Sequence, residues 1–443
     1  MSDEAAVARF QTLLRIPTES RYELDRVQWD QFDRFAQTLT RLYPLVHQRL
    51  EREVVAGHSL LYRWRGAQST EPAVLMAHYD VVPATDVGWR HPPFAGELSG
   101  SGEERLIWGR GTLDDKGSVV AILEAVEAQL AAGLSPHQDV YLFFGHDEET
   151  LGSGAVAAVD LLAARGVRPT LVLDEGGAIA RDAFPAVDAP MAFVGAGEKA
   201  PNTVRLIVDQ PGGHASTPPR ETSTTRLARA ILNLNAKPFP SALNPILLAL
   251  LETIGQHAGG GLGFAARNAR WLSPVVRPML ERVSPEVNAM MRTTQAVTML
   301  EAGSAPNALA ERASAIVNVR VSVDSTVDEA LDHLRKAIDD ETVRIELEHR
   351  SDPVPVSPLT GLAWELVAAT IEKSFPGTVV APYIQTGATD SRQFTRISQG
   401  VYRFTPFDVT REQRDALHAR NERLHVSAWL RGIEFYRSLL SAL

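Results

Sequence analysis

Apolar positions in the first half of the chain follow two alternating patterns, short continuous runs and helical spacing. The runs predict buried strands, and the spacing predicts helices. The predicted strands are residues 73–77, 106–108, 141–144 and 171–173, and the predicted helices are residues 4–14, 116–130 and 155–164. This order is typical of a sheet with helices on both faces, so we expect an α/β domain.

From residue 202 the pattern changes to polar and apolar positions in alternation, at residues 204–208 and again at residues 315–323. Alternation of this kind predicts half-buried strands. A helix at residues 329–338 and a further strand at residues 343–347 follow, so this part of the chain predicts a small α+β sandwich. Residues 238–294 have mainly helical spacing and are expected to form an insertion into it.

The end of the chain returns to the first pattern, with helices predicted at residues 359–372 and 426–440 and a strand at residues 401–404. We therefore predict one α/β domain, residues 1–199 and 355–443, interrupted by an inserted α+β domain, residues 200–354.

Composition narrows the classes of protein and site that are possible. The 443 residues are 44% hydrophobic and 22% charged, which is typical of a folded globular protein of two or three domains. The net charge of −10 argues against nucleic acid as a partner. Since the chain has no cysteine, any metal would be held by His, Asp or Glu.

The N-terminus is acidic and lacks the features of a secretory signal, and the most apolar run, residues 246–251, is too short to span a bilayer. We therefore expect a cytoplasmic protein with no membrane partner.

Five short polar segments stand out because each is expected where a strand ends, and strand ends are where α/β sheets bind ligands. They are residues 77–80, 109–117, 147–149, 174–176 and 418–422. Any one segment alone is weak evidence for a binding site, since a His after a strand is more often a hydrogen-bonded polar residue than a ligand. Together they indicate a site.

Within these segments, acidic and His side chains have the spacing that metal sites use. His78 and Asp80 are two residues apart in extended chain and point to the same side, so Asp80 can orient a metal-bound imidazole. A hydrogen-bonded pair without metal is the alternative. Asp114 could bridge two cations, although the adjacent Asp residues could also simply cap the following helix.

Residues 147–149 place three acids after an apolar run, where crowded carboxylates raise one another's pKa unless a cation is present. One of the two adjacent glutamates can bind metal while the other accepts a proton from water. A solvated acidic loop is the alternative for this segment.

Together the segments resemble the M20 family of co-catalytic zinc metallopeptidases and aminoacylases, and within it the branch of Gly-Xaa carboxypeptidases and N-acyl-amino-acid hydrolases. The matching stretches are residues 78–83, 108–117, 147–154, 212–219 and 387–392. Several spaced motifs are far more specific than one Gly-rich loop. The resemblance implies a zinc-peptidase-type sheet with helices on both faces, together with an inserted lid and dimerisation domain.

The resemblance also implies two Zn²⁺ ions that share one bridging carboxylate, with Co²⁺ or Mn²⁺ as substitutes. The implied metal ligands are His78, Asp114, Glu149, Glu175 and His418, with Asp114 as the bridge. Asp174 is the alternative to Glu175, and His425 is read as structural.

The same resemblance implies the catalytic roles. Asp80 would support His78, and Glu148 would act as general base for water between the cations. In dimers of this family the residue that matches His214 reaches the site of the partner subunit and stabilises the oxyanion. Asn307, Arg320 and Gly387 match positions that contact the substrate.

We therefore predict a homodimeric dizinc hydrolase that cleaves the amide bond next to a free C-terminal carboxylate, in dipeptides or N-acyl amino acids. Two alternatives stay open: a non-catalytic, metal-stabilised binding protein on the same fold, and synthesis of N-acyl amino acids by the same site. The insertion at residues 238–294 would shape an acyl pocket or extend the dimer contact, and the sequence does not choose between these.

Overall fold

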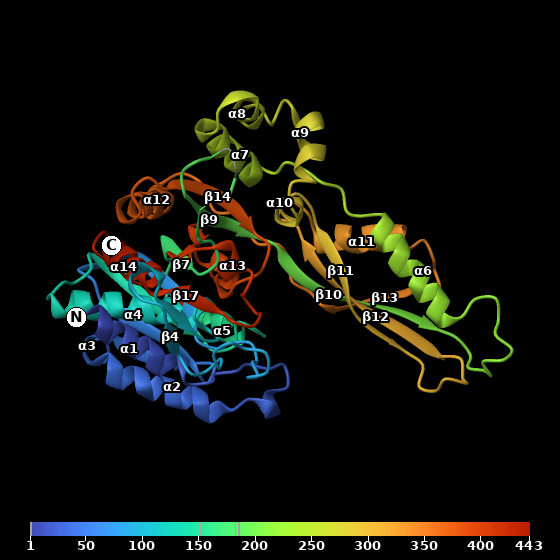
Figure 1. Ribbon diagram of the computed structural model, residues 1–443, viewed down its shortest axis with the longest axis horizontal. Helices are drawn as coiled ribbons and strands as arrows, with labels where there is room; N and C mark the ends of the chain where they lie inside the picture. Colours follow the sequence, from blue (N-terminus) through green and yellow to red (C-terminus); the bar gives the residue numbers. More distant parts are fainter. Residues whose placement is uncertain (1, 151, 182, 185–186) are drawn as a thin grey trace. The chain divides into compact units, whose positions relative to one another are not determined.

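The computed structural model describes residues 2–150, 152–181, 183–184 and 187–443, which divide into two compact units (Figure 1). The first unit comprises Met1–Ala196, Ser357–Pro382 and Thr389–Leu443, and the second comprises Gly197–Val356 and Tyr383–Ala388. The prediction placed the crossings at residues 199/200 and 354/355 and kept residues 383–388 in the first domain. In the structure, that short segment groups with the second unit.

The first unit is built on a mixed ten-stranded sheet in the order β1-β2-β6-β3-β7-β15-β9-β8-β16, with β14 paired to β9. The strands are β1 Glu51–Val55, β2 Ser59–Trp64, β3 Gln68–His78, β6 Gln138–Gly145, β7 Leu171–Asp174, β8 Ile179–Ala180, β9 Met191–Glu198, β14 Val379–Gln385, β15 Val401–Arg403 and β16 Asp408–Val409. Strands β6, β3, β7 and β15 are parallel neighbours. A small sheet of β4 (Glu97–Ser99), β5 (Leu106–Trp108) and β17 (Arg423–His425) lies in the same unit.

Helices cover both faces of the large sheet, which confirms the predicted fold class. Val74 and Met76 of β3 pack against α5 (Ser153–Ala164), while α4 (Lys116–Ala131) also contacts β3. Successive side chains of a strand point to opposite faces of the sheet. The central strands β6 and β7 are buried at every position, so both faces of the sheet are covered there. The other main helices are α1 Asp3–Leu14, α2 Trp29–Leu42, α3 Pro44–Arg49, α12 Leu362–Ser374 and α14 Val426–Leu440.

The second unit contains an antiparallel four-stranded sheet in the order β11-β12-β10-β13. Its strands are β10 Ala200–Asp209, β11 Thr294–Ala302, β12 Arg312–Val321 and β13 Arg344–His349. Helices α6 (Ser223–Ala236) and α11 (Val327–Ile338) pack on one face of the sheet (Figure 1), burying alternate residues such as Val204, Leu206 and Val208. The alternating pattern therefore becomes an α+β sandwich.

Residues 238–294 hold the helices α7 Pro245–His257, α8 Gly260–Arg267, α9 Ser273–Leu280 and α10 Pro285–Met290. Helix α7 begins at Asn244, whose side chain accepts a hydrogen bond from the Leu247 amide. Among the described residues, no helix combines the length and apolar character needed to cross a membrane.

Candidate metal centre

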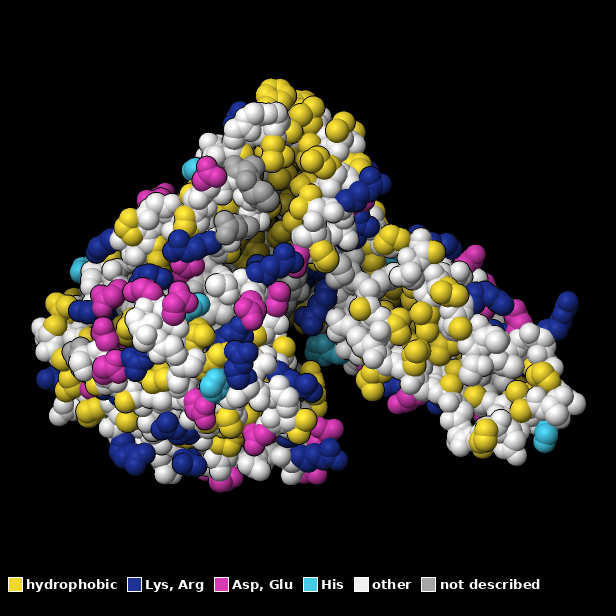
Figure 2. Space-filling view, viewed as in Figure 1, with side chains coloured by type: hydrophobic (Ala, Val, Ile, Leu, Met, Phe, Trp, Pro, Cys, Tyr) yellow, Lys and Arg dark blue, Asp and Glu magenta, His cyan; other side chains and the backbone are white. Residues whose placement is uncertain are grey.

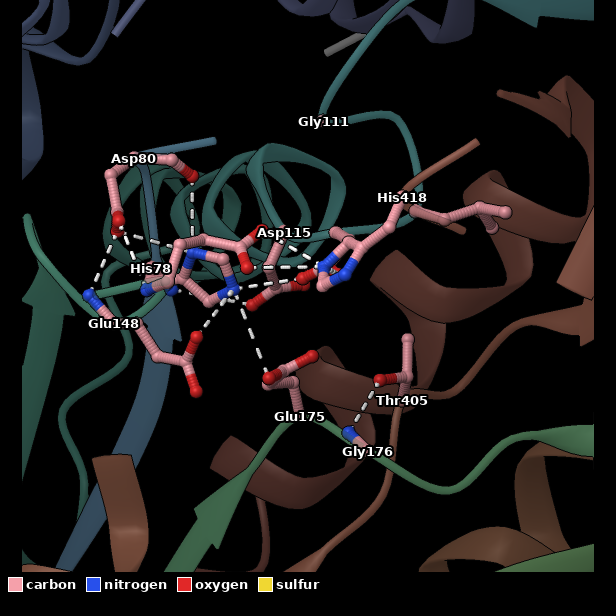
Figure 3. Close-up of polar contacts among 12 residues, drawn as sticks. His78, Asp80, Gly111, Asp115, Glu148, Glu175, Gly176, Thr405 and His418 are labelled. Atoms are coloured by element: carbon pink, nitrogen blue, oxygen red, sulfur yellow. Dashed lines mark hydrogen bonds and ion pairs between the residues drawn. The ribbon is translucent and has the colours of Figure 1, made fainter. Parts of the chain in front are cut away.

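Three adjacent parallel strands bring their polar ends to one edge of the large sheet. His78 ends β3, residues 147–149 follow β6, and Glu175 follows β7. Since β6 and β7 flank β3 in parallel register, their carboxyl ends meet there. Figure 3 shows Glu148 and Glu175 directed toward the ring of His78.

His78 is buried and is held on both sides of its ring. Its Nδ1 lies 3.1 Å from the backbone oxygen and 3.3 Å from the Oδ1 atom of Asp80, and its Nε2 lies 2.9 Å from Asp114 Oδ1. The Asp80 carboxylate also accepts the amides of Glu148 and Glu149, each at 3.2 Å. Asp80 therefore orients the imidazole and the acidic loop together.

Asp114 lies between two imidazoles, and each contacts a different carboxylate oxygen. His78 Nε2 is 2.9 Å from Oδ1, and His418 Nε2 is 2.9 Å from Oδ2. His418 Nε2 also lies 3.1 Å from Glu149 Oε1. A carboxylate in this position can join two cations.

In the described part of the chain, two groups of side chains have the donor atoms for a metal ion. They are His78, Asp114 and Glu175, and Asp114, Glu149 and His418, and within each group the donor atoms lie within 4.8 Å of one another. Imidazole and carboxylate donors suit Zn²⁺, and three protein ligands leave a coordination position open. The residues present thus fit a pair of divalent cations.

The electrostatics of the cluster also favour a cation. Burial raises the pKa values of Glu148, Glu175 and Glu149, and neighbouring carboxylates raise them further. By contrast, burial favours a higher pKa for Asp114, but the hydrogen bonds and charges of His418 and His78 together lower its pKa, while Asp114 and Glu149 raise the pKa of His418 to about 10. Divalent cations would compensate the crowded negative charge.

Two other acids of these segments have structural contacts. Asp174 Oδ2 accepts the Ser391 amide at 2.9 Å, and so the structure groups Glu175 rather than Asp174 with the donor atoms. Asp147 accepts the amides of Ser153 and Gly154 at 2.8 and 3.1 Å at the start of α5.

Glu422 has a role that sequence reasoning missed. Its buried carboxylate accepts the amides of Gly111, Leu113 and Asp114 at 3.1, 2.8 and 3.2 Å, and Arg110 Nη1 lies 2.6 Å from it. The loop that ends at the bridging aspartate is therefore fixed by one carboxylate. The only sign of this role in the sequence is that an acidic residue follows His418 by four positions.

The segment at residues 418–422 was expected at the end of a strand, and that expectation was wrong. It lies between α13 (Arg411–Arg414) and β17, with left-handed backbone at His418 (φ 55°) and Asn421 (φ 65°). The turns, not a strand end, position the imidazole. His425 ends β17, with Nδ1 3.0 Å from Gln413 Nε2, and belongs to neither donor group.

Asp115 and Asp390 are two further buried acids. Asp115 is the N-cap residue of α4, as the capping alternative had it, but its side chain makes no capping hydrogen bond. Asp115 Oδ2 accepts a hydrogen bond from the backbone amide of His78 at 3.3 Å. Asp115 and Asp80 therefore both hold His78 in place. Asp390 is packed so closely on Gly145 that a Cβ atom there would lie 2.4 Å from Asp390 Oδ2.

Two predicted substrate contacts lie on paired loops of the second unit. The Ala215 amide donates to Asn307 O at 3.0 Å, and the Leu309 amide donates to Gly213 O at 2.8 Å, so His214 and Asn307 are neighbours. The Ser216 amide donates to His214 Nδ1 at 3.1 Å, which makes Nε2 the protonated nitrogen and a potential donor.

Arg320 lies at the other end of the same sheet. It pairs with Pro201, whereas Asp209 and Arg312 pair at the end that leads to His214. The eight residue-to-residue steps from Arg312 to Arg320 span about 27 Å of extended strand.

The segment that carries Gly387 lies near the Arg320 end, since the Lys199 amide donates to Gln385 O at 3.0 Å. Lys199 is itself a buried cation. Burial, and then Arg320, lower its pKa to about 7, and Nζ donates to Ala289 O at 3.0 Å and Thr294 Oγ1 at 2.8 Å.

Proteins of known sequence resemble the chain over almost its whole length. N-fatty-acyl-amino acid synthase/hydrolase PM20D1 of Xenopus tropicalis is 36% identical, covering 96% of this chain and 83% of the relative. The Homo sapiens protein of the same name is 34% identical, with coverages of 99% and 88%. Probable carboxypeptidase S-like 2 of Dictyostelium discoideum is 34% identical, with coverages of 93% and 80%.

Solved structures share the fold at low sequence identity. The M20 family metallo-carboxypeptidase Sso-CP2 from Sulfolobus solfataricus has a TM-score of 0.72 at 16% identity and covers 98% of both chains. Human carnosine dipeptidase 1 has a TM-score of 0.66 at 15% identity, covering 100% of this chain and 97% of the other. The family model of peptidase family M20/M25/M40 matches residues 74–442. The chain therefore belongs to this family and is a hydrolase of amide bonds.

Proposed function

We propose that the chain uses two divalent cations, with zinc as the first candidate, to cleave the amide bond next to a free C-terminal carboxylate in dipeptides or N-acyl amino acids. The observation that carries the proposal is the position of Asp114, whose two oxygens each lie 2.9 Å from a different imidazole. A bridging carboxylate with one His on each side is the donor set of a two-metal site.

The residues divide the chemistry between them. When bound, the cations supply the acidity that makes water a nucleophile near neutral pH. Glu148 lies 4.0 Å from His78 Nε2 and outside both donor groups, so its carboxylate is available to accept the proton of that water and return it to the leaving amine. Asp80 holds His78 and, through two amide hydrogen bonds, the loop that carries Glu148.

The substrate class follows from the relatives together with the site. Relatives named as synthase/hydrolases of N-fatty-acyl amino acids and as carboxypeptidase-like proteins support an amide that joins an acyl group to an amino acid. The same site also catalyses the reverse reaction, because a catalyst does not move an equilibrium. Substrate concentrations would then decide the net direction.

The proposal includes a homodimer in which His214 of the partner subunit stabilises the oxyanion. The loops that carry His214 and Asn307 leave the sheet at the Arg312 end of β12, about 27 Å along the strand from Arg320, which supports it. A small substrate cannot contact both ends of that sheet, so the two groups of one chain would serve different active sites, with Arg320 and Gly387 near the substrate carboxylate.

The test of the general base compares Glu148→Gln with Glu149→Gln, using Gly-Xaa dipeptides and N-acyl amino acids with short and long acyl chains. We expect Glu148→Gln to keep its metal and lose about 100-fold to 10,000-fold in kcat. Glu149→Gln should bind less metal because a donor is lost. Full metal binding by wild type with no turnover of any amide would favour the alternative of a binding protein.

The dimer proposal is tested by mixing two inactive variants, His214→Ala and Glu148→Ala. If His214 acts across the dimer, an exchanged heterodimer contains one complete site. A 1:1 mixture should then recover about a quarter of wild-type activity, because half of the dimers are mixed and one site in each is intact. No recovery after verified subunit exchange would place His214 in the active site of its own subunit and contradict action across the dimer.

A further inference from the structure

The helical insertion exposes a row of large apolar side chains at intervals of four residues. Trp271, Val275, Met279 and Val283 run along α9 and its flanking turns, and each is between 53% and 84% exposed. Val275 and Met279 are four apart and lie on one face of α9, and Trp271 and Val283 add exposed apolar side chains in the turns on either side of the helix. Figure 2 shows hydrophobic side chains gathered over this part of the molecule.

Packing of the insertion does not account for this row, which we call the α9 row. Val276 of the same helix is buried, as are Ala266 and Ala269, so the insertion already has an inner apolar face. Leu262 and Phe264 of α8 are exposed as well and enlarge the apolar surface. Soluble proteins rarely leave such a patch uncovered unless it binds something.

The charges around the row indicate what it binds. Residues 258–284 contain four arginines and one glutamate, a net charge of +3 in a chain whose net charge is −10. The single acid, Glu281, is 2.8 Å from Arg292 and so is already paired. The arginines at positions 267, 270, 277 and 282 are all exposed. The apolar surface is therefore framed by positive charge.

We propose that the α8–α9 segment, residues 260–283, docks on an anionic lipid surface. The α9 row would enter the boundary between headgroups and acyl chains, with Trp271 at the interface and the arginines against lipid phosphates. Short helices with an apolar edge and a basic rim lie in the interface and do not span it. The proposal therefore departs from the expectation of no membrane partner, which considered only runs long enough to span a bilayer. A second copy of the chain is a poorer occupant because it would bring like charge against the same face.

The test measures co-sedimentation of the full-length, metal-loaded protein with vesicles of phosphatidylcholine alone and of phosphatidylcholine mixed with phosphatidylglycerol. Wild type should bind the mixed vesicles. The triple variant Trp271→Ser/Val275→Ser/Met279→Ser should lower the partition coefficient by about tenfold or more. The matched control, Val87→Ser/Leu232→Ser/Leu300→Ser, removes three side chains that are between 65% and 73% exposed outside the segment, and it should bind like wild type.

A second variant separates the role of charge. Arg270→Gln/Arg282→Gln should weaken binding to the mixed vesicles, and added salt should reduce the difference from wild type because it screens the arginines. Neither variant touches the carboxylate cluster, and binding is measured without turnover, so the result is independent of the proposed function.

Three outcomes would overturn the inference. One is that wild type does not bind the mixed vesicles, and another is that both triple variants bind equally. The third is that light scattering finds self-association which needs the α9 row while vesicle binding is absent. That third result would assign the face to a second copy of the chain.

Discussion

The carboxylate cluster at the edge of the large sheet and the α8–α9 segment depart from the usual distribution of side chains in opposite directions. The cluster buries charge, with Asp114, Glu148 and Glu175 crowded around His78. The α8–α9 segment exposes apolar surface, with Trp271 and Val275 on its outer edge. Both arrangements cost free energy in the isolated chain. Each region would be relieved of that cost by the partner proposed for it, cations at the cluster and an anionic lipid surface at the α8–α9 segment.

The largest effect should come from removing the metal. Chelation should abolish amide hydrolysis, and zinc should restore it, because in the proposed mechanism the two donor groups would hold the ions that activate water. Zinc should also stabilise the folded state. The free energy of unfolding, followed by thermal unfolding in parallel, should rise by about 4 kcal/mol when free zinc is about a thousand times its dissociation constant. Unchanged turnover in a chelator that removes all bound metal would contradict the two-metal proposal.

The next largest effect should come from Glu422, which holds the loop of the carboxylate cluster that ends at Asp114. Glu422→Gln leaves the buried Arg110 guanidinium without its anion, so it should lower the free energy of unfolding by about 3 to 5 kcal/mol. It should also weaken metal binding, because one of the two acceptor oxygens becomes an NH2 donor, which must then face either Arg110 or the amides of the loop that ends at Asp114.

The matched control is Glu53→Gln, which breaks an ion pair of the same length, 2.6 Å, between exposed partners. Its cost should stay below about 1 kcal/mol in denaturant unfolding. Equal costs for the two variants would mean that burial of the Glu422 pair is not what holds the loop.

Lys199 is a buried ionisable group in the same unit as the α8–α9 segment, so it tests whether burial of a charge also costs stability outside the carboxylate cluster. Its folded pKa of about 7 lies below the ordinary value of 10.5, so the unfolded chain binds more protons between these two values. Stability from this group is therefore present above the unfolded pKa and is lost as pH falls toward 7.

Between pH 7 and 9 the unfolding free energy of wild type should rise relative to Lys199→Met, by up to about 1.4 kcal/mol per pH unit. Denaturant titrations at several pH values measure the two slopes. Parallel slopes would mean that the Lys199 ammonium keeps its proton in the folded protein.

The smallest effect on stability should come from a substitution in the exposed α9 row. Met279→Ser should change the free energy of unfolding by no more than about 0.5 kcal/mol, because the side chain is exposed and contributes little to the core. Val276→Ser on the inner face of the same helix is the control and should cost clearly more. A large loss for Met279→Ser would place the α9 row in the fold instead of on a docking face.

Local patterns were enough to predict many elements. The helix expected at residues 116–130 is α4, Lys116–Ala131, and the apolar run at residues 141–144 lies in β6, Gln138–Gly145. Elements such as α2, β1 and β9 were not predicted. Strand β9 has two glycines among its eight residues, and its stability comes from β15 and β8 as neighbours, which a local pattern does not contain.

The candidate site divides in the same way. Residues at strand ends, such as His78, could be anticipated because parallel neighbours bring their carboxyl ends together. Glu422 belongs to a segment that the sequence singled out, but its role could not be anticipated, since its hydrogen bonds reach amides more than 300 positions earlier in the chain. Contacts over such distances depend on the completed fold. The exposure of Trp271 is likewise a property of the folded chain, because apolar spacing alone does not say which face is covered.

Asp80 has a consequence for anyone who would redesign this catalyst. One carboxylate steadies the imidazole on β3 and accepts two successive amides of the loop after β6. A change introduced there to retune the affinity for one cation would also shift the loop that carries Glu148, the proposed base. Directed evolution of the site should therefore find its improvements as combinations of substitutions, and libraries that vary one position at a time should miss them.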